Sequence, residues 1–363
     1  MSKVKTSNNS NKAETKSKDK PNVSWIKLYT YATALDWLGL LFGAICAIGS
    51  GAALPLLSLI LGNVINILGT FTAGTATPDQ LMEQIGKSAL YFVYLAIGVF
   101  ATTYIFMAIY KSIGERLTYI IRHRYLVGVL KQEMAWSDAY GAGQVATCIT
   151  SNTDLVQDGI SEKVALIIHD LATFISGFVI AFVKNWKLTL VTMCIVPIIV
   201  IVIFFLNKYM VKYSTSSLDE YANAGTLAEE SISSIRTLIA FNQKNKILKR
   251  YQEIIKKAEA SGLKKSISLG IALGCIFCTI YLGYALAFWF GGKLILWGES
   301  DGGSIVSVFS AILVGTFSLS NVAPNFQSIL LARGAAFKLF EAIDRVPVID
   351  SSSDAGLKPS IVT

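Results

Sequence analysis

The stretch that decides the fold is ESISSIRTLIAFNQKNKILKRYQEIIKKAEASGLKK, residues 230–265. It is polar and basic, but residues 235–241 form an apolar island within it. Apolar runs of membrane length lie on both sides of it. Long structureless loops are uncommon, and apolar residues keep recurring here at intervals of three or four. We therefore expect a helical connection between two membrane spans, with an apolar patch at its turn.

The composition indicates an integral membrane protein. The chain has 363 residues, of which 53% are hydrophobic and 15% are charged, and its mean hydropathy is +0.53. Soluble domains usually carry about 25% charged residues. A helix needs about 20 apolar residues to cross a bilayer. Six segments satisfy this requirement, at about residues 37–68, 88–110, 164–183, 188–206, 268–290 and 304–325.

The distribution of Lys and Arg predicts the orientation of these spans. Of the 32 basic residues, 28 fall in the terminal segments and in the second and fourth connections. The alternate connections hold only Lys87, Lys184, Lys187 and Lys293. Cytosolic loops carry the excess of positive charge, so both termini are expected in the cytosol. The net charge of +8 then reflects orientation, and no nucleic-acid partner is indicated.

The regions before and after the spans differ from them in composition. Residues 1–24 are rich in Lys, Ser and Asn and are expected to form a disordered cytosolic tail. In SWIKLYTYATALDW, residues 24–37, Trp25, Leu28 and Tyr29 recur at helical spacing. An interfacial helix on the cytosolic leaflet is the favoured interpretation, and a flanking aromatic belt is the alternative. Residues 25–345 would form the membrane domain, followed by a linker over 346–363.

Both inner connections, 111–163 and 207–265, are expected to be helical hairpins. They contain no proline, so the spans can continue into the cytosol as helices. A helix over about residues 88–133 would be about 69 Å long, well over the thickness of a bilayer. The turns are expected at SDAYGAGQ, residues 137–144, and at RTLIAFNQK, residues 236–244. An apolar patch at such a tip marks a docking site for another protein module.

Six longer motifs give the chain a specific resemblance. They are GAALPLLSLILG at 51–62, QEMAWSD at 132–138, NWKLTLVTMCIVP at 185–197, AEESISSIRTLIAFNQ at 228–243, YALAFWFGGKLI at 284–295 and ARGAAFKLFEAID at 332–344. Together they resemble the transmembrane domain of B-subfamily ABC exporters, most closely the N-terminal half of P-glycoprotein-like multidrug exporters. The resemblance implies an all-α membrane protein with six long transmembrane helices and cytosolic helical extensions, the type-1 exporter fold.

The resemblance also implies a mechanism in which short coupling helices at the hairpin tips dock on nucleotide-binding domains. Residues 137–142 would form the first coupling helix and residues 236–244 the second, with Phe241 as the apolar plug. Local hairpin packing is the alternative role for Phe241. The candidate coupling residues are Ser137, Asp138, Ala139, Tyr140, Arg236, Thr237, Ile239, Phe241 and Gln243.

By the same resemblance, a lipophilic substrate would bind in an apolar and aromatic cavity. The candidate lining residues are Leu54, Leu57, Leu61, Phe277, Tyr281, Tyr284, Phe309, Leu313, Phe317 and Asn321. Helix or lipid packing is the alternative for each. Ser310, Ser58 and Leu61 stand where relatives carry larger or aromatic side chains, so a changed or narrower substrate range is an open alternative.

The motifs of ATP hydrolysis are missing from the sequence. A phosphate-binding loop needs G-x-x-x-x-G-K-[ST], and the nearest string, Gly86-Lys87-Ser88, has Leu81 in place of the first glycine. We find no ABC signature or Walker B segment. The chain is therefore expected to bind no cofactor and to have no catalytic residue. ATP and Mg²⁺ would act through nucleotide-binding domains supplied outside these residues, alongside a second transmembrane half.

The remaining polar and sulfur-containing residues indicate no other chemistry. The chain has two histidines, too few for a histidine metal cluster. The CIFC motif at 275–278 lies in an apolar run and is interpreted as helix packing. His169 and Asp170 fall inside the third span. A pH-sensitive pair is the alternative, because ionisable residues inside a membrane usually face a cavity or each other. Neighbouring residues point about 100° apart on a helix, so we favour an interior or interfacial placement without catalysis.

Two functions from different classes fit the sequence. The first is the substrate-translocating half of an ATP-driven exporter of lipophilic compounds in the plasma membrane. The second is a truncated, non-transporting binding or regulatory protein that pairs with complete exporters. A six-span channel is less favoured because no filter or ring-forming charge motif is present.

Overall fold

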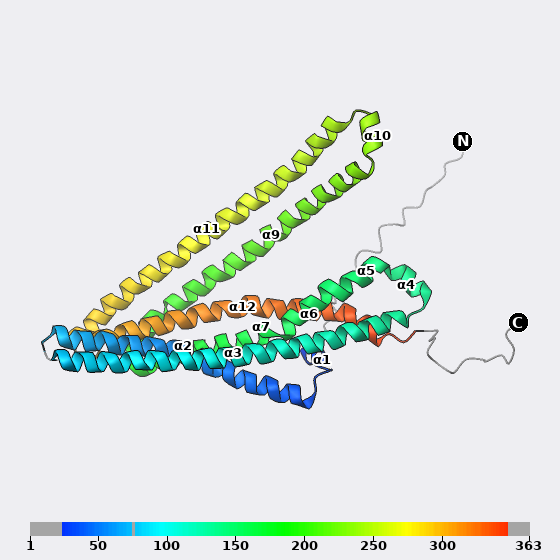
Figure 1. The fold of residues 1–363 in the computed structure, drawn as a ribbon. Coiled ribbons are helices and arrows are strands. Elements are labelled where there is room, and N and C mark those ends of the chain that lie inside the picture. The colour runs from blue at the N-terminus through cyan, green and yellow to red at the C-terminus, as the bar shows by residue number, and fades with distance from the viewer. Residues whose placement is uncertain (1–23, 75–76, 348–363) are drawn as a thin grey trace, which may run out of the picture. The chain divides into compact units, whose positions relative to one another are not determined.

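The computed structural model describes residues 24–74 and 77–347 (Figure 1). The described residues form helices joined by short turns, and no strand occurs among them. This confirms the all-α fold class. Six helical runs in these ranges are long and apolar enough to cross a membrane, and they coincide with the six predicted spans.

The spans are longer than their apolar cores. They comprise α2 (Ala34–Thr72), α3 (Pro78–Leu130), α7 (Glu162–Lys184), α8 (Trp186–Met193) continued by α9 (Ile195–Ser233), α11 (Lys244–Leu296) and α12 (Gly302–Asp344). Thus α3 begins ten residues before the predicted 88–133 helix and ends three residues before its predicted end. Pro55 and Pro324 lie inside α2 and α12, where neighbouring helices can compensate for the lost backbone bonds.

Short elements complete the chain. These are α1 (Trp25–Leu28), α4 (Met134–Tyr140), α5 (Ala142–Thr147), the π-helical turn η1 (Cys148–Asn152), α6 (Thr153–Ile160) and α10 (Ile235–Ala240). The predicted interfacial helix is therefore a single turn, and the chain breaks before α2. The Asp36 carboxylate accepts the Thr33 backbone N–H at 2.7 Å. This is half of a capping box, and it explains why α2 starts at Ala34.

The chain divides into two compact units, and the long helices run through both. Of the residues that the structure describes, the first unit comprises 24–51, 97–172 and 321–347. Its core is built from α1, the start of α2, the second half of α3, α6, α7 and the end of α12. Leu117, Tyr125, Val156 and Leu339 are among its fully buried side chains. Gly159 packs against Ala332 so closely that an added Cβ would overlap it.

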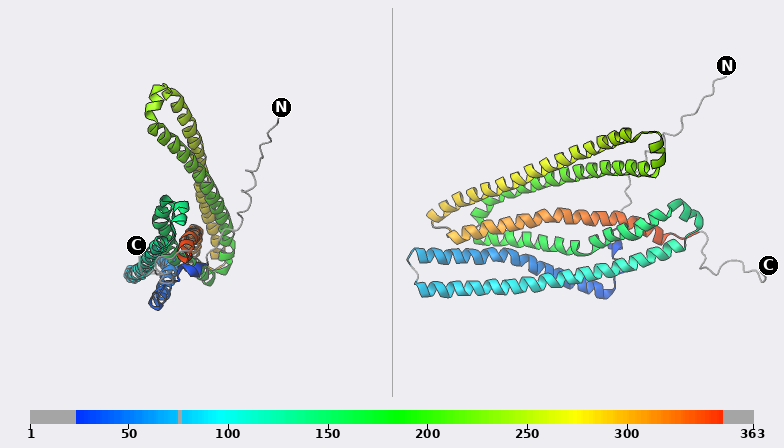
Figure 2. Two further views of the ribbon diagram at one scale, coloured as in Figure 1. Left: turned by 90° about the vertical axis from the view of Figure 1, so that its right-hand side faces the viewer. Right: turned by 45° about the horizontal axis from the view of Figure 1, so that its top comes forward.

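The second unit comprises residues 52–96 and 173–320. Helices α9 and α11 run side by side as a long antiparallel pair joined by α10 (Figures 1 and 2). One core cluster lies around Leu188, Leu294 and Val308, and another around Ile199 and Phe309. The Asn185 side chain accepts the Leu188 N–H at 3.0 Å, which caps α8 at the tight outer turn.

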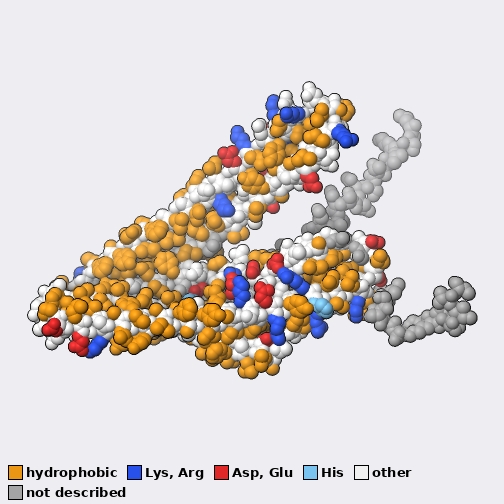
Figure 3. Space-filling view, viewed as in Figure 1, with side chains coloured by type: hydrophobic (Ala, Val, Ile, Leu, Met, Phe, Trp, Pro, Cys, Tyr) orange, Lys and Arg blue, Asp and Glu red, His pale blue; other side chains and the backbone are white. Residues whose placement is uncertain are grey.

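The surface is unusually apolar for a folded protein. Large hydrophobic side chains are exposed along α2, α3, α9 and α11. In Figure 3 hydrophobic side chains cover α9 and α11 over most of their length, and Lys and Arg gather toward the α10 end. Apolar patches of this extent mark contact with a membrane or with other proteins, and the chain is an integral membrane protein.

Candidate functional site

The tip of the α9–α11 hairpin is built by two breaks in the helical backbone. Ser234 leaves the helical conformation, with φ −102° and ψ 27°, and separates α9 from α10. At the other end Asn242 has φ +50°. Its N–H bonds to the Ile239 carbonyl at 3.0 Å, and the Gln243 N–H bonds to the Leu238 carbonyl at 3.1 Å. This is a Schellman motif, which stops α10 and turns the chain into α11.

The structure thus shortens the predicted second coupling helix. Residues 236–240 belong to α10, residues 241–243 form the turn, and Lys244 already begins α11. The predicted Arg236, Thr237 and Ile239 lie on α10, while Phe241 and Gln243 lie in the turn. The turn thus falls inside the predicted 236–244 range, but the sequence did not locate the end of α10, because the left-handed residue is an asparagine rather than a glycine.

An apolar surface is exposed at this tip. Ile239 and Phe241 are each 70% exposed, and Ile232 and Ile235 are also exposed. None of the α10 residues is buried. Phe241 therefore does not fill an intramolecular pocket, contrary to the local-packing alternative. We call Ile232, Ile235, Ile239 and Phe241 the tip patch.

The first hairpin tip, around α4, lies against the end of α12. Trp136 stacks on Tyr140 with ring centroids 4.6 Å apart, and the Arg345 guanidinium lies 5.5 Å from the Trp136 ring. Arg345 also pairs with Glu133 at 2.9 Å. The predicted turn lies at Gly141, whose φ of +78° is accessible to glycine.

Among the first-tip candidates, Tyr140 is anchored and Asp138 is exposed. The Tyr140 hydroxyl lies 3.7 Å from the buried Cys148 thiol. Burial raises the pKa of this phenol to about 12, with a smaller contribution from Cys148, so Tyr140 stays protonated and neutral. Ser137 and Ala139 belong to α4, but their side chains are outside those that the structure describes.

The candidate cavity residues occupy three helices. Leu54, Leu57 and Leu61 are exposed on α2, and Phe277, Tyr281 and Tyr284 are exposed on α11. On α12, Phe317 and Asn321 are exposed, and Leu313 is partly buried.

Phe309 is the exception, because it is only 3% exposed. Its ring packs against Tyr284 with centroids 4.2 Å apart and belongs to the cluster around Ile199. The structure therefore joins Tyr284, Phe309 and Leu313 in one packing cluster and leaves the other candidate side chains on exposed helix faces.

His169 and Asp170 approach each other despite their angular separation on α7. His169 Nδ1 lies 3.3 Å from the Asp170 carboxylate, and both side chains are largely buried. The His169 ring also lies 6.0 Å from Phe106. The favoured interior placement is thus observed, and the two side chains also contact each other directly.

Sequence reasoning missed a close contact between the C-terminal half of α2 and the start of α12. The Gly303 N–H donates to the Asn66 side-chain oxygen at 2.7 Å, and the Ser307 hydroxyl donates to the Ser58 carbonyl at 2.9 Å. Gly62 packs there against Gly303 and Ser307. Small residues at this spacing are typical of helix interfaces in membranes, and this was the available signal.

No group of His, Cys, Asp and Glu in the described part of the chain is arranged to hold a metal ion.

Comparison with known proteins identifies the fold. The family described as the ABC transporter transmembrane region matches residues 40–317. The chain belongs to this family. The matched residues include all or part of each of the six spans, and the resemblance stated from the sequence is confirmed.

Similar proteins include fungal transporters. The chain is 41% identical to the ABC multidrug transporter atrD of Emericella nidulans over 93% of its length, and 41% identical to the ABC multidrug transporter mdr1 of Aspergillus fumigatus over 92%. It is 40% identical to the ABC multidrug transporter MDR1 of Cryptococcus neoformans over 93%. The chain spans about a quarter of the length of these curated relatives.

Proposed function

We propose that this ABC transmembrane region is the substrate-translocating half of an ATP-driven exporter of lipophilic compounds. The observation that carries the proposal is the similarity of nearly the whole chain to proteins named as multidrug transporters. The exposed apolar and aromatic faces of α2, α11 and α12 support it, because bulky lipophilic ligands bind through apolar area and contacts with aromatic rings.

In this proposal ATP hydrolysis is supplied by nucleotide-binding domains that dock on the hairpin tips. The tip patch fits such a role because its large apolar side chains are exposed at the end of the long α9–α11 hairpin. Phe241 and Ile239 would fill an apolar cleft of the ATPase domain. On the first hairpin, α4 would make the second contact, and its packing on Arg345 would connect that contact to the end of α12.

The proposed orientation follows from the distribution of basic residues. The α4 and α10 tips and both termini lie in the cytosol, and the turns at Asn185 and Gly298 lie on the outer side. The plasma membrane is the proposed location, where export of lipophilic compounds removes them from the cell.

The test is ATP-dependent accumulation of a fluorescent lipophilic dye in inside-out membrane vesicles. The chain is assembled with nucleotide-binding domains and a second transmembrane half. We expect accumulation with ATP and none with ADP, and we expect Tyr281→Ala to raise the dye concentration needed for half-maximal uptake. Phe205→Ala, an exposed aromatic on α9 outside the proposed cavity, is the matched control. The absence of ATP-dependent accumulation by the assembled wild type would contradict the proposal.

A further inference from the structure

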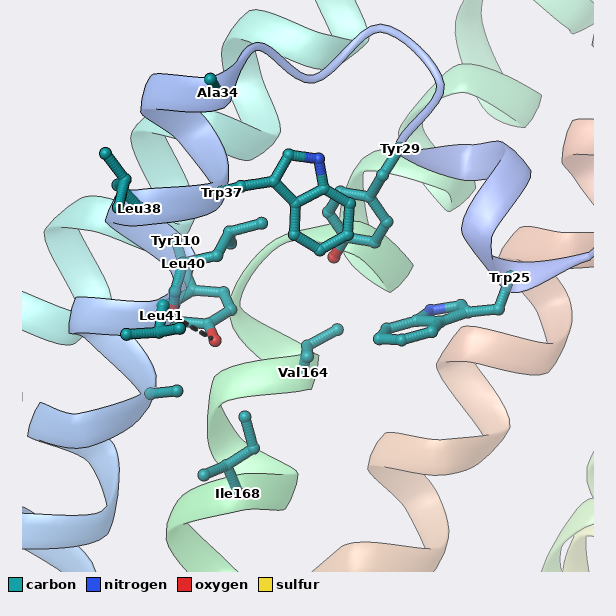
Figure 4. A pocket seen from close by; sticks show the side chains of 11 residues that line it. Trp25, Tyr29, Ala34, Trp37, Leu38, Leu40, Leu41, Tyr110, Val164 and Ile168 are labelled. Carbon is teal, nitrogen blue, oxygen red and sulfur yellow. Dashed lines mark hydrogen bonds between the residues drawn. The ribbon is translucent and has the colours of Figure 1, made fainter.

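An open apolar groove lies beside the short helix α1, within the first unit. It has a volume of about 810 Å³, inside the roughly 300–1,000 Å³ range of small-molecule sites. Figure 4 shows the Trp25 and Trp37 rings with Val164 and Ile168 around it. The complete lining is Trp25, Tyr29, Ala34, Trp37, Leu38, Leu40, Leu41, Ala44, Tyr110, Val164 and Ile168.

The hydroxyl groups of its two tyrosines are already hydrogen-bonded within the protein. The Tyr29 hydroxyl donates to the Ile160 carbonyl at 2.7 Å, and the Tyr110 hydroxyl donates to the Leu40 carbonyl at 3.1 Å. The groove therefore presents an apolar wall made of rings and aliphatic chains. Such a surface favours a hydrocarbon ligand over water.

A second groove of about 400 Å³ shares Trp25, Val164 and Ile168 with the first. It continues along α12, where its further lining residues are Phe326, Ile329, Leu330 and Arg333, with Ile167 on α7. Trp25 thus borders both grooves. Among the described residues that line them, Arg333 alone carries a charge.

The charge lies at one end of an otherwise apolar site. Arg333 is one helical turn beyond Ile329 toward the C-terminal end of α12. Val164, in the first turn of α7, lines the same groove. In the proposed orientation, on which this inference rests, this is the cytosolic end. A guanidinium has five N–H donors in a planar fork that suits phosphate, so it can contact more than one partner.

We propose that the two grooves hold one anionic phospholipid of the cytosolic leaflet. One acyl chain lies in the groove between α1, α2, α3 and α7, and the glycerol and second chain pass beside Trp25. The phosphate and anionic headgroup meet Arg333. Aromatic side chains such as Trp25 and Trp37 favour the boundary between hydrocarbon and headgroups, which agrees with this depth. The lipid would fix α1, a single helical turn, against the membrane domain.

Native mass spectrometry of the full chain released from detergent tests this proposal. The probes are phosphatidylserine and phosphatidylcholine with identical acyl chains, added at equal concentration. We expect one retained phosphatidylserine and roughly fivefold weaker retention of phosphatidylcholine, the factor that corresponds to about 1 kcal/mol per basic residue at an anionic leaflet. Arg333→Gln should reduce phosphatidylserine retention to the phosphatidylcholine level.

The placement of the lipid acyl chain is tested by substitutions that fill the groove. Ala44→Phe should lower the retention of both lipids, whereas Ala96→Phe, on an exposed face of α3 outside both grooves, should leave it unchanged. If Ala44→Phe does not yield a monodisperse protein, Leu38→Trp fills the same groove from an exposed position. Lys212→Gln on α9 is the charge control for Arg333→Gln.

Equal retention of the two lipids by the wild type would overturn the proposal. So would unchanged selectivity in Arg333→Gln, or preferential retention of an added sterol that Ala44→Phe abolishes. Transport is not part of the readout, so failure of the lipid site and failure of the proposed export function are distinguishable.

Discussion

Gly62 allows α2 and α12 to approach closely, because its side chain is a hydrogen rather than a methyl group. A Cβ at this position would overlap the Ser307 hydroxyl and the Gly303 carbonyl oxygen. The hydrogen bonds from Gly303 to Asn66 and from Ser307 to Ser58 depend on the same close approach. Gly69, two turns further along α2, has open space where its Cβ would be.

We therefore expect Gly62→Ala to destabilise the protein by about 1–3 kcal/mol, the usual cost of overpacking. Gly69→Ala should be neutral or slightly stabilising, because alanine favours helix over glycine. The measurement is the apparent Tm in detergent, followed by size-exclusion chromatography after heating. Equal Tm values for the two variants would show that α2 and α12 do not approach closely at Gly62.

Phe241 is exposed, so its substitution is expected to affect the binding of a nucleotide-binding domain without affecting the stability of the fold. It is 70% exposed, so Phe241→Ala should change the free energy of unfolding by no more than about 0.5 kcal/mol, as for ordinary surface substitutions, and leave the apparent Tm close to that of the wild type. Truncation of a buried interface aromatic costs at least about 2 kcal/mol. The affinity of a nucleotide-binding domain for the chain should thus fall more than tenfold, as measured by titration. Leu218→Ala, an exposed position on α9 away from the tip patch, should bind normally.

At the scale of elements, the α10 turn depends on the left-handed conformation of Asn242. Asparagine tolerates this region better than most residues, and glycine tolerates it best. The two hydrogen bonds of the Schellman motif, to Ile239 and Leu238, require that conformation. The end of α10 thus depends on the backbone conformation of Asn242, since no α10 residue is buried.

Asn242→Val should destabilise this turn by about 1–2 kcal/mol, and Asn242→Gly should preserve it. Hydrogen exchange of the α10 and Gln243 amides measures the difference locally. We expect faster exchange in Asn242→Val and wild-type rates in Asn242→Gly. Equal exchange in both variants would mean that the turn is held by other contacts.

The sequence predicts elements that are set by hydropathy or by local turn chemistry, and it does not predict those that are set by tertiary packing. The six spans follow from hydropathy, because bilayer thickness sets a length that only long apolar helices satisfy. The turn at Gly141 follows from local chemistry. Local chemistry does not predict the end of α10, the short α1 or the grooves beside Trp25. Each depends on which side chains tertiary packing brings together. Phe309 is a similar case, because its helical spacing is the same whether it faces a cavity or Tyr284.

At the scale of the whole molecule, the basic residues predict one topology. We expect tags before Trp25 and after Arg345 to be accessible only after cells are permeabilised. The same accessibility is predicted for a tag inserted at Asn242, because residues 207–265 are rich in Lys and Arg, as are the terminal segments. A tag at Gly298 should be accessible on intact cells. Labelling of the Asn242 tag on intact cells would contradict the orientation.

The central claim is that an apolar hairpin tip couples this membrane domain to ATP hydrolysis elsewhere in the transporter. The most direct measurement is ATP-dependent dye accumulation in inside-out vesicles that carry the assembled transporter, with dye binding measured in parallel. We predict that Phe241→Ala abolishes most accumulation and leaves dye binding intact, while Leu218→Ala changes neither. Normal accumulation and normal dye-stimulated ATP hydrolysis in Phe241→Ala would contradict the account.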